Sequence, residues 1–404
     1  MSTAAAHISP GPVPEVAEVF AFAQNEIRSA TAELWPGARV EFSSHIPSVT
    51  GYVHHIRVGG RELYAKHSFL GMSLVSILRG VAGDWAEVQR DQAVYIQRPD
   101  ALLMREAAQL RLLADLGRPR VCEVAGLAHG VLFTVPVPGP TLAALLLHDP
   151  ASTAALFESV FADLHRLHHS RTAQRLAPAG AICERSVAAT FQRKFNGISG
   201  QTYLSRLGAE RCAEADRAEV AALLRAVVAR LHRMRPTTLA PGQAVLTYGD
   251  LKPEHLVFPD GPGERPVLID PGLLRARSSV DAAKLTSRTV LLLASARPGA
   301  TVTEEIADGL GAFAEQRMRP MAPKAARSWL RELLIVWLMD TVNILTTVLS
   351  APAVLPLPPH GGRLLERAVA VCTMADRIST ALGSELDVHR MWDTALAQAK
   401  AVAE

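Results

Sequence analysis

The sequence is poor in cysteine and in aromatic residues. Its four cysteines stand far apart, at positions 122, 183, 212 and 372, and aromatic residues make up 5% of the chain. No CxxC pair occurs, so the spacing argues against a bound metal cluster. The four thiols could pair into two disulfides. We favour the alternative, a reduced set of small buried residues in a cytoplasmic protein.

The chain also lacks a strong charge of one sign. It has 42 Lys and Arg residues against 39 Asp and Glu residues, a net charge of +3 over 404 residues. No dense run of basic residues is present, so we expect no nucleic-acid partner. The first sixteen residues, "MSTAAAHISPGPVPEV", have neither a basic start nor a continuous apolar core. We therefore do not expect a signal peptide there.

Long hydrophobic runs are scarce as well. The most apolar long stretch is 333–350, and Asp340 and Asn343 interrupt its centre. Its length is marginal for a membrane span, so we expect a buried helix and no membrane partner. Trp337, Asp340 and Asn343 recur at helical spacing, either to line a pocket or to pack in the core.

The first third of the chain predicts a small mixed lobe. Helical periodicity covers 15–34, and runs rich in β-branched and aromatic residues follow at 38–45, 52–58 and 61–68. Gly59-Gly60 is a hairpin signal, so these runs predict a three-stranded antiparallel meander. Residues 69–98 are harder to place: "LVSILRGV" looks helical and "GDWAEVQRDQAVYIQR" looks mixed. A helix from Pro99 to Gly117 comes next, and two further strands are expected at 120–128 and 130–137.

The rest of the chain predicts a large helical lobe. Helices are expected at 141–148, 152–170, 185–206, 214–234, 279–296, 302–318, 325–350, 362–382 and 384–402. We therefore predict an α+β, bilobal protein. It would comprise a lead-in and helix (1–37), a small sheet lobe (38–137) and a helical lobe (138–404). Its oligomeric state is not predicted.

One short segment interrupts the helices. The stretch "LTYGDLKPEHLVF" (246–258) leaves a strand, places Asp250 and His255 in a tight loop, and returns to a strand. A turn at 260–263 leads into "PVLID", which ends in Asp270. We expect this hairpin to bring the two acids and the histidine to one end of a ribbon. Acids placed there bind a cation or accept a proton.

This segment resembles the aminoglycoside phosphotransferase and choline kinase family, which has a protein-kinase-like fold. The family carries a loop of the form H-G-D-x-x-x-x-N, followed by a strand and I-D. Here the spacing is the same, but Tyr248 stands in place of the histidine and His255 in place of the asparagine. Ile269-Asp270 matches the second motif.

Further features follow in the family's order from about residue 38 to 295. "LYAK" ends in Lys66, where the family keeps a phosphate-binding lysine, and "MREAAQLRLL" supplies Glu106 as its partner. "FTVPVPGPTL" resembles the linker between the lobes and "FADLHRLHH" the helix before the catalytic loop. "SSVDAAKL" gives Asp281 where the family often has D-L-A, although a first-turn helix acid is the alternative. We assign His165, His168 and His169 to a helix surface.

The resemblance implies a role for each matching residue. Asp250 would orient the substrate hydroxyl or accept its proton, and Lys252 would stabilise the transferring phosphate. Asp270 would hold Mg²⁺, and Lys66 paired with Glu106 would neutralise the phosphates of ATP or GTP. The remaining nucleotide contacts would come from the loop 43–51, through Ser44, Ser48 and Thr50, and from 133–137, including Phe133 and Val135.

His255 admits three interpretations. It ligates a metal, or it holds the loop by a hydrogen bond to Asp250, or a single metal on Asp270 suffices. Imidazole is a softer ligand than an asparagine oxygen and suits Zn²⁺ or Mn²⁺ better than Mg²⁺.

The predicted activity is phosphorylation of a small-molecule alcohol, such as an antibiotic or another natural product. A polycationic acceptor would favour a strongly acidic cleft, and the acids of the C-terminal helices, such as Glu332 and Glu366, are scattered. The alternative is a pseudokinase-like module that binds nucleotide or protein without turnover. A protein kinase ranks last, because the chain reaches a helix by about residue 279 and has no A-P-E motif.

Overall fold

The structure is a computed structural model that describes residues 14–169, 184–234, 244–384 and 387–404. The chain divides into two compact units, and each is described by itself. The small unit consists of Met1–Ala107, Val124–Pro136 and Ala351–Pro358. The large unit consists of Ala108–Glu123, Val137–Ser350 and Pro359–Glu404.

An antiparallel five-stranded sheet forms the centre of the small unit, in the order β1-β2-β3-β6-β5. Its strands are β1 (Val40–Ile46), β2 (Tyr52–Val58), β3 (Arg61–His67), β5 (Val124–Ala128) and β6 (Val131–Thr134). The predicted meander is confirmed. Gly59 and Gly60 both have positive φ, 56° and 87°, as the two central residues of a type I′ hairpin turn require.

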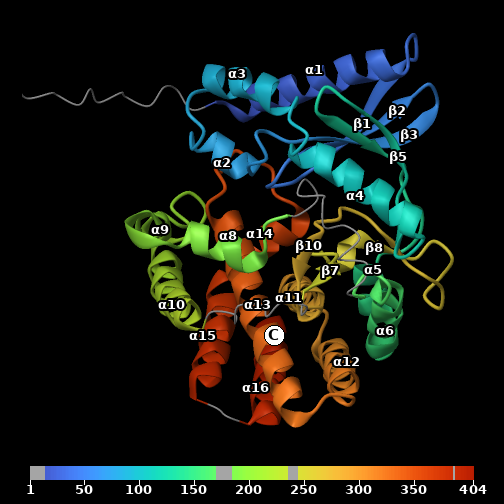
Figure 1. Ribbon diagram of the computed structural model, residues 1–404. Coiled ribbons are helices and arrows are strands. Elements are labelled where there is room, and N and C mark those ends of the chain that lie inside the picture. The colour runs from blue at the N-terminus through green and yellow to red at the C-terminus, as the bar shows by residue number, and fades with distance from the viewer. Residues whose placement is uncertain (1–13, 170–183, 235–243, 385–386) are drawn as a thin grey trace, which may run out of the picture. The chain divides into compact units, whose positions relative to one another are not determined.

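Three helices lie within the small unit, and a fourth begins there. They are α1 (Val16–Leu34), α2 (Leu74–Leu78), α3 (Trp85–Tyr95) and α4 (Leu102–Leu116). α1 was predicted from its periodicity, and its buried Val19, Ala23 and Ile27 lie one turn apart and face the sheet. Figure 1 shows this helix running across the strands. α2 and α3 lie in the stretch 69–98, and α2 falls in "LVSILRGV", the part that looked helical.

A short segment from late in the chain completes the core of the small unit. Ala351–Pro358 belongs to this unit although both of its neighbours in sequence belong to the large one. Ala351 and Leu355 are buried there among the side chains of α1, α2 and the sheet. The small unit is therefore built from three separate stretches of the chain.

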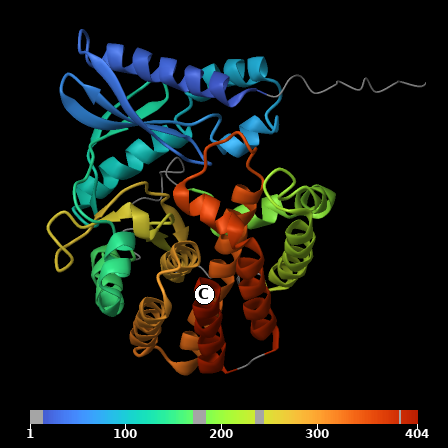
Figure 2. The same cartoon turned by 180° about the vertical axis from the view of Figure 1, so that it is seen from behind.

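The large unit is mostly helical. Its helices are α5 (Leu142–His148), α6 (Thr153–Leu164), α8 (Val187–Lys194), α9 (Gly197–Ser205), α10 (Glu214–Arg233), α11 (Ser279–Ala296), α12 (Ala300–Met318), α13 (Pro323–Leu349), α14 (Pro359–Glu366), α15 (Ala368–Ser384) and α16 (Val388–Ala403), with the 3₁₀ turns η1 (Pro150–Ser152) and η3 (Pro253–His255). α13 packs against α8, α11, α14 and α15, and the view from behind in Figure 2 shows the bundle around it.

Two predicted helices are each divided in two. The expected helix 185–206 breaks between α8 and α9 at Asn196-Gly197, where Gly197 has a φ of 56°. The expected helix 362–382 is divided between α14 and α15. Helical periodicity continues through such short breaks, so the pattern alone did not reveal them.

α13 is the one described helix with the length and hydropathy of a membrane span, and 83% of its most apolar window is buried inside the protein. This burial agrees with the predicted core helix. Trp337, Asp340 and Asn343 are all buried, so core packing, and not a pocket lining, describes them.

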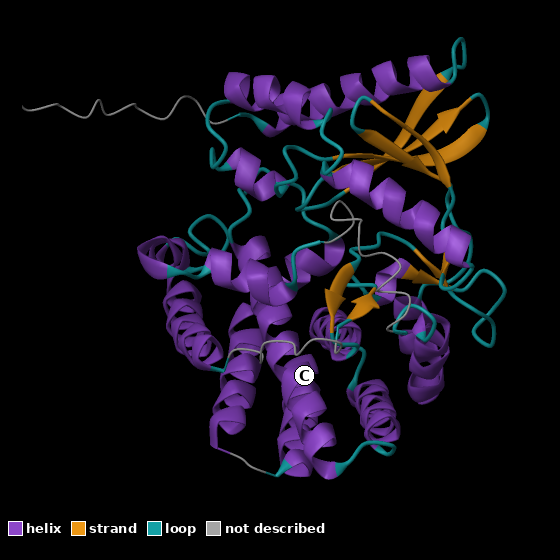
Figure 3. Cartoon of the chain, in the orientation of Figure 1, coloured by secondary structure: helices purple, strands orange, loops and turns teal. Residues whose placement is uncertain are grey.

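The strands of the large unit are short, as Figure 3 shows. They are β4 (Arg120–Val121), β7 (Val245–Thr247), β8 (Leu256–Val257), β9 (Val267–Leu268) and β10 (Leu274–Ala276). The predicted hairpin is present as β8 and β9. β7 pairs instead with β10, which was not predicted, and β4 adds to β9 in parallel. The predicted strand 120–128 is thus divided between the two units.

Three of the four cysteines lie in the described residues. Cys122 and Cys372 are buried and Cys212 is partly exposed. Cys183 lies outside the described residues.

Candidate active site

The small unit contributes a lysine–glutamate ion pair. Lys66 lies near the end of β3, and Glu106 lies on α4 one turn after the helix begins. Lys66 Nζ donates to Glu106 Oε1 at 2.7 Å, and each side chain is 13% exposed. The structure thus brings together two residues that stand 40 positions apart in the sequence.

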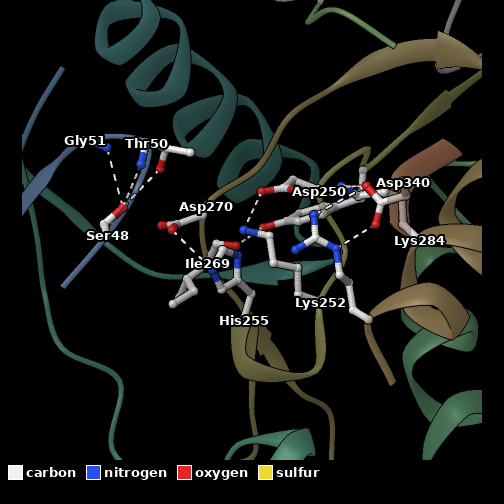
Figure 4. A network of polar contacts seen from close by, with 12 residues as sticks. Ser48, Thr50, Gly51, Asp250, Lys252, His255, Ile269, Asp270, Lys284 and Asp340 are labelled. Carbon is white, nitrogen blue, oxygen red and sulfur yellow. Dashed lines mark hydrogen bonds and ion pairs between the residues drawn. The ribbon is translucent and has the colours of Figure 1, made fainter. Parts of the chain in front are cut away.

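The loop between β1 and β2 is organised by a serine hydroxyl. Ser48 Oγ accepts hydrogen bonds from the backbone N–H groups of Thr50 (3.2 Å) and Gly51 (3.4 Å), and lies 3.1 Å from Thr50 Oγ1 (Figure 4). The carbonyl groups of Val49 and Thr50 accept from the first residues of α2. Ser44 lies before this loop, exposed on β1 where the register shifts. The loop is closed without a glycine-rich repeat.

The two residues expected beside adenine occupy different environments. Phe133 lies inside β6, between partners on β3 and β5, and its ring is fully buried. Val135 follows the last residue of β6 and is half-buried. Of the two, Val135 lies beyond the ladder of paired strands.

In the large unit, the backbone of the candidate catalytic loop requires a glycine. Gly249 has a φ of 81°, and a Cβ atom there would collide with the carbonyl oxygen of Gly272. Tyr248, which replaces the family's histidine, is fully buried and donates its hydroxyl to the carbonyl of Ile269 at 2.8 Å. This bond ties the loop to the strand end that carries Asp270.

A buried carboxylate holds the same backbone. Asp281 accepts hydrogen bonds from the N–H groups of Tyr248 and Gly249, both at 2.8 Å. His168 Nε2 lies 2.8 Å from its Oδ2 atom, and Asp281 itself has no exposed surface. Asp281 does lie in the first turn of α11, but its contacts are with the loop. His168, assigned to a helix surface from the sequence, instead contacts this buried acid.

Asp250 is held between two ammonium groups. Lys252 Nζ lies 2.9 Å from one carboxylate oxygen, and Lys284 Nζ lies 2.9 Å from the other (Figure 4). Burial would raise the pKa of Asp250, but Lys252 and Lys284 hold it well below its usual range. Asp250 is therefore ionised at neutral pH.

Lys284 belongs to a row of alternating charges. It also donates to Asp340 on α13 at 3.0 Å, and Arg288, one turn further along α11, donates to the same carboxylate at 2.6 and 3.3 Å. Burial would raise the pKa of Asp340, but Arg288 and Lys284 lower it. Lys284 and Arg288 were not predicted from the sequence. They stand three and seven residues after Asp281, a spacing that places all three side chains on one face of the helix and could have indicated them.

Asp270 and His255 lie next to each other. Asp270 has a φ of 56°, uncommon for a residue other than glycine, and its Oδ2 lies 3.5 Å from His255 Nε2. Burial, and next the Lys252 ammonium, lowers the pKa of His255 to about 4. The imidazole is thus neutral at pH 7, with a nitrogen lone pair available to a ligand.

This pair can form part of a divalent metal site. Among the described residues, no group of three or more His, Cys, Asp or Glu side chains could hold a metal ion. Mg²⁺ at nucleotide sites typically has one or two protein carboxylates and takes its other ligands from phosphates and water. Asp270 fits that donor set. His255 adds a neutral nitrogen in place of the family's amide oxygen, and its Nδ1 atom is buried without a hydrogen-bond partner.

The chain matches one protein family in sequence and is similar in structure to several solved proteins. Residues 88–320, more than half of the chain, match the model of the phosphotransferase enzyme family. An amicoumacin kinase solved with AMP-PNP, Ca²⁺ and Ami is similar in structure, with a TM-score of 0.54 at 14% identity over 93% of this chain and 99% of that one. Comparison with curated protein sequences finds no match.

Two further solved structures are similar at lower scores. The choline kinase LicA from Streptococcus pneumoniae covers 87% of this chain and 99% of its own, with a TM-score of 0.43 at 14% identity. A spectinomycin phosphotransferase in complex with ADP and spectinomycin covers 83% and 92%, with a TM-score of 0.44 at 10% identity. The family match shows that the chain belongs to the phosphotransferase enzyme family, and its fold is protein-kinase-like.

Proposed function

We propose that this protein transfers the γ-phosphoryl group of ATP or GTP to a hydroxyl group of a small molecule, such as an antibiotic or another natural product. The acceptor oxygen forms a bond to the γ-phosphorus as the bond to the β,γ-bridging oxygen breaks. The nucleoside diphosphate leaves, and the hydroxyl proton is released. Such transfer depends mainly on positioning and on charge neutralisation.

One observation carries the proposal. Asp250 is an ionised, partly exposed carboxylate on a loop whose backbone is fixed by the buried Asp281. A carboxylate placed in this way can accept a hydrogen bond from an acceptor hydroxyl and align it for attack. The family match supports the same role for Asp250.

The nucleotide and metal would be held by residues already described. Asp270, with His255 beside it, would hold Mg²⁺, which supplies charge neutralisation at the phosphates when bound. Lys66, kept in place by Glu106, would bind the phosphates. Lys252 would reach the transferring group from its place beside Asp250.

The polar contacts also bear on the acceptor. Asp340 is buried and already bound by Lys284 and Arg288, and Glu332 is bound by Arg277 and Ser279. These acids of α13 therefore have cationic or hydroxyl partners from the chain itself. This supports an acceptor with less positive charge than a polycationic aminoglycoside.

A direct test is release of ADP in the presence of ATP, Mg²⁺ and a panel of hydroxylated natural products. Asp250→Asn removes the charge that orients the hydroxyl, and we expect acceptor-dependent turnover to fall by about 10²- to 10⁴-fold. Asp308→Asn changes an exposed acid on α12 and is the matched control. Acceptor-dependent turnover that is equal in both variants would contradict the proposal.

His255, which stands where the family has asparagine, favours a second candidate function: a module that binds nucleotide without turnover. Thermal unfolding with ATP, measured with and without Mg²⁺ or Mn²⁺, separates the two. Stabilisation by ATP that needs no metal, together with no ADP release for any acceptor, would favour the binding module.

A further inference from the structure

The two lysines on Asp250 differ in how firmly they are held. Lys252 lies on the same loop, two residues after Asp250, and its side chain is 19% exposed. Lys284 comes from α11, and its side chain is 7% exposed. An ammonium group near the surface can turn toward a bound phosphate, whereas a buried one is confined by its partners.

Lys284 is fixed from its far side. Asp340 Oδ1 accepts from Lys284 Nζ at 3.0 Å, while Asp340 Oδ2 accepts from Arg288 Nε at 2.6 Å and from the hydroxyl of Ser287 at 3.1 Å. Asp340 is thus satisfied on both oxygens. The row Asp250–Lys284–Asp340–Arg288 alternates in sign, and Figure 4 shows its first three members close together. Because Lys284 has an acidic partner on each side, its ammonium group has little freedom to move.

We infer that Lys284 is a positioning residue of this site: anchored by Asp340, it fixes the Asp250 carboxylate when Lys252 turns to the transferring phosphate. The inference rests on the proposed function, because it assumes that Asp250 meets the acceptor hydroxyl. It assigns the two lysines different tasks. Lys252 exchanges partners during turnover, and Lys284 keeps its partner throughout.

A chemical consequence follows for Asp250. A carboxylate that retains a lysine partner is a weak base, so Asp250 orients the hydroxyl and does not remove its proton early. This fits phosphoryl transfer through a loose transition state, in which the attacking oxygen needs little activation.

The test uses the full-length protein and a direct reading of Asp250. The carboxyl carbon of Asp250 is followed by ¹³C NMR as a function of pH and is assigned by its loss in Asp250→Asn. The charged groups around it are Lys252, Glu254 and His255 of its own loop, Lys284 and Arg288 of α11, Asp340 of α13, Asp270 after β9, and Glu184. In Lys284→Met we expect its pKa to rise by about one unit or more.

Matched variants separate positioning from general damage. Arg277→Met removes another cation that links the start of α11 to α13, through Glu332, without touching Asp250. It should leave the pKa of Asp250 where it is. Lys284→Arg keeps the charge and should restore the wild-type value. If Lys284→Met does not fold, Lys284→Gln removes the charge while retaining a hydrogen bond to Asp340.

ATP hydrolysis, with water as the acceptor, gives the second reading. We expect the acidic limb of its pH profile to move to higher pH in Lys284→Met and to stay in place in Arg277→Met. An unchanged Asp250 pKa in the folded Lys284 variants would overturn the inference. If the wild type releases no ADP with any acceptor of the panel, the proposed function fails, and the NMR titration still decides the role of Lys284.

Discussion

The two units bury their polar side chains in different ways. Among the described residues, the buried acidic and lysine side chains all belong to the large unit: Asp163, Asp281, Lys284 and Asp340. The small unit instead buries two histidines, His54 and His67.

Each unit therefore stabilises its loop by a different kind of interaction. In the large unit, buried ions fix the candidate catalytic loop before any ligand arrives, because an unpaired buried charge is costly. In the small unit, the loop between β1 and β2 is closed by the partly exposed hydroxyl of Ser48, whose hydrogen bonds are individually weak. We expect the first loop to be rigid and the second to re-form around a nucleotide.

The largest expected effect comes from removing a buried ion. Asp281→Ala would leave the N–H groups of Tyr248 and Gly249 and the ring of His168 without their acceptor. We expect the free energy of unfolding to fall by about 3–5 kcal/mol, as for other broken buried pairs. Urea denaturation measures this change.

Asp308→Ala is the control for that measurement. Its side chain is 73% exposed and paired with Lys400, and it should cost no more than about 1 kcal/mol. If the free energy of unfolding fell equally in the two variants, burial of Asp281 would not determine how much it contributes to stability.

An intermediate effect is expected from acid. Burial lowers the pKa of His67 to about 4, and burial followed by the charges of His45 and His55 lowers that of His54 to about 4. The unfolded state takes up these protons near pH 6.5 and the folded state only near pH 4. The unfolded state therefore binds more protons between these values, so stability falls as pH drops from about 6.5 to 4.

Replacing one of these histidines tests the effect. His67→Gln removes one titrating group, and we expect its urea midpoint to fall less between pH 7 and pH 4.5 than that of the wild type. His389→Gln, at an exposed position of α16, should follow the wild-type curve. His255 titrates in the same window in the large unit, so its contribution stays in both curves.

The smallest effect is expected at the hydroxyl of Ser48. Ser48→Ala frees the N–H groups of Thr50 and Gly51, and the unfolding free energy should change by less than about 1 kcal/mol. Because the loop re-forms around nucleotide, we expect the KM for ATP to rise by roughly 2–5-fold with kcat nearly unchanged. A fall in kcat comparable to that of Asp250→Asn would show that this loop, too, must be preformed.

Sequence reasoning located the residues whose spacing is local. Short stretches of sequence were enough to predict the hairpin at Gly59-Gly60, the loop around Asp250 and the position of Asp270. In each, turn residues stand directly beside residues with a strand pattern. Lys66 and Glu106 were found through the family resemblance, which places a lysine at the end of the third strand and its glutamate partner on the next clear helix.

Other features depend on packing between distant segments. Lys284 touches Asp250 because α11 packs against the loop at Tyr248 and Gly249, which is far from α11 in the sequence. β7 pairs with β10 over a gap of 26 residues, and strands of two or three residues are too short to show a period. The helix breaks at Gly197 and Arg367 were not predicted, because helical periodicity continues across a short break.

The segment Ala351–Pro358 has a consequence for how the protein is made. Leu355 fills part of the core beneath the sheet, yet it is synthesised more than 200 residues after the last strand of that sheet. A nascent chain that has emerged only as far as Pro136 would hold an incomplete core. The small unit, although it begins the chain, can therefore be finished only when synthesis of the large unit is nearly complete.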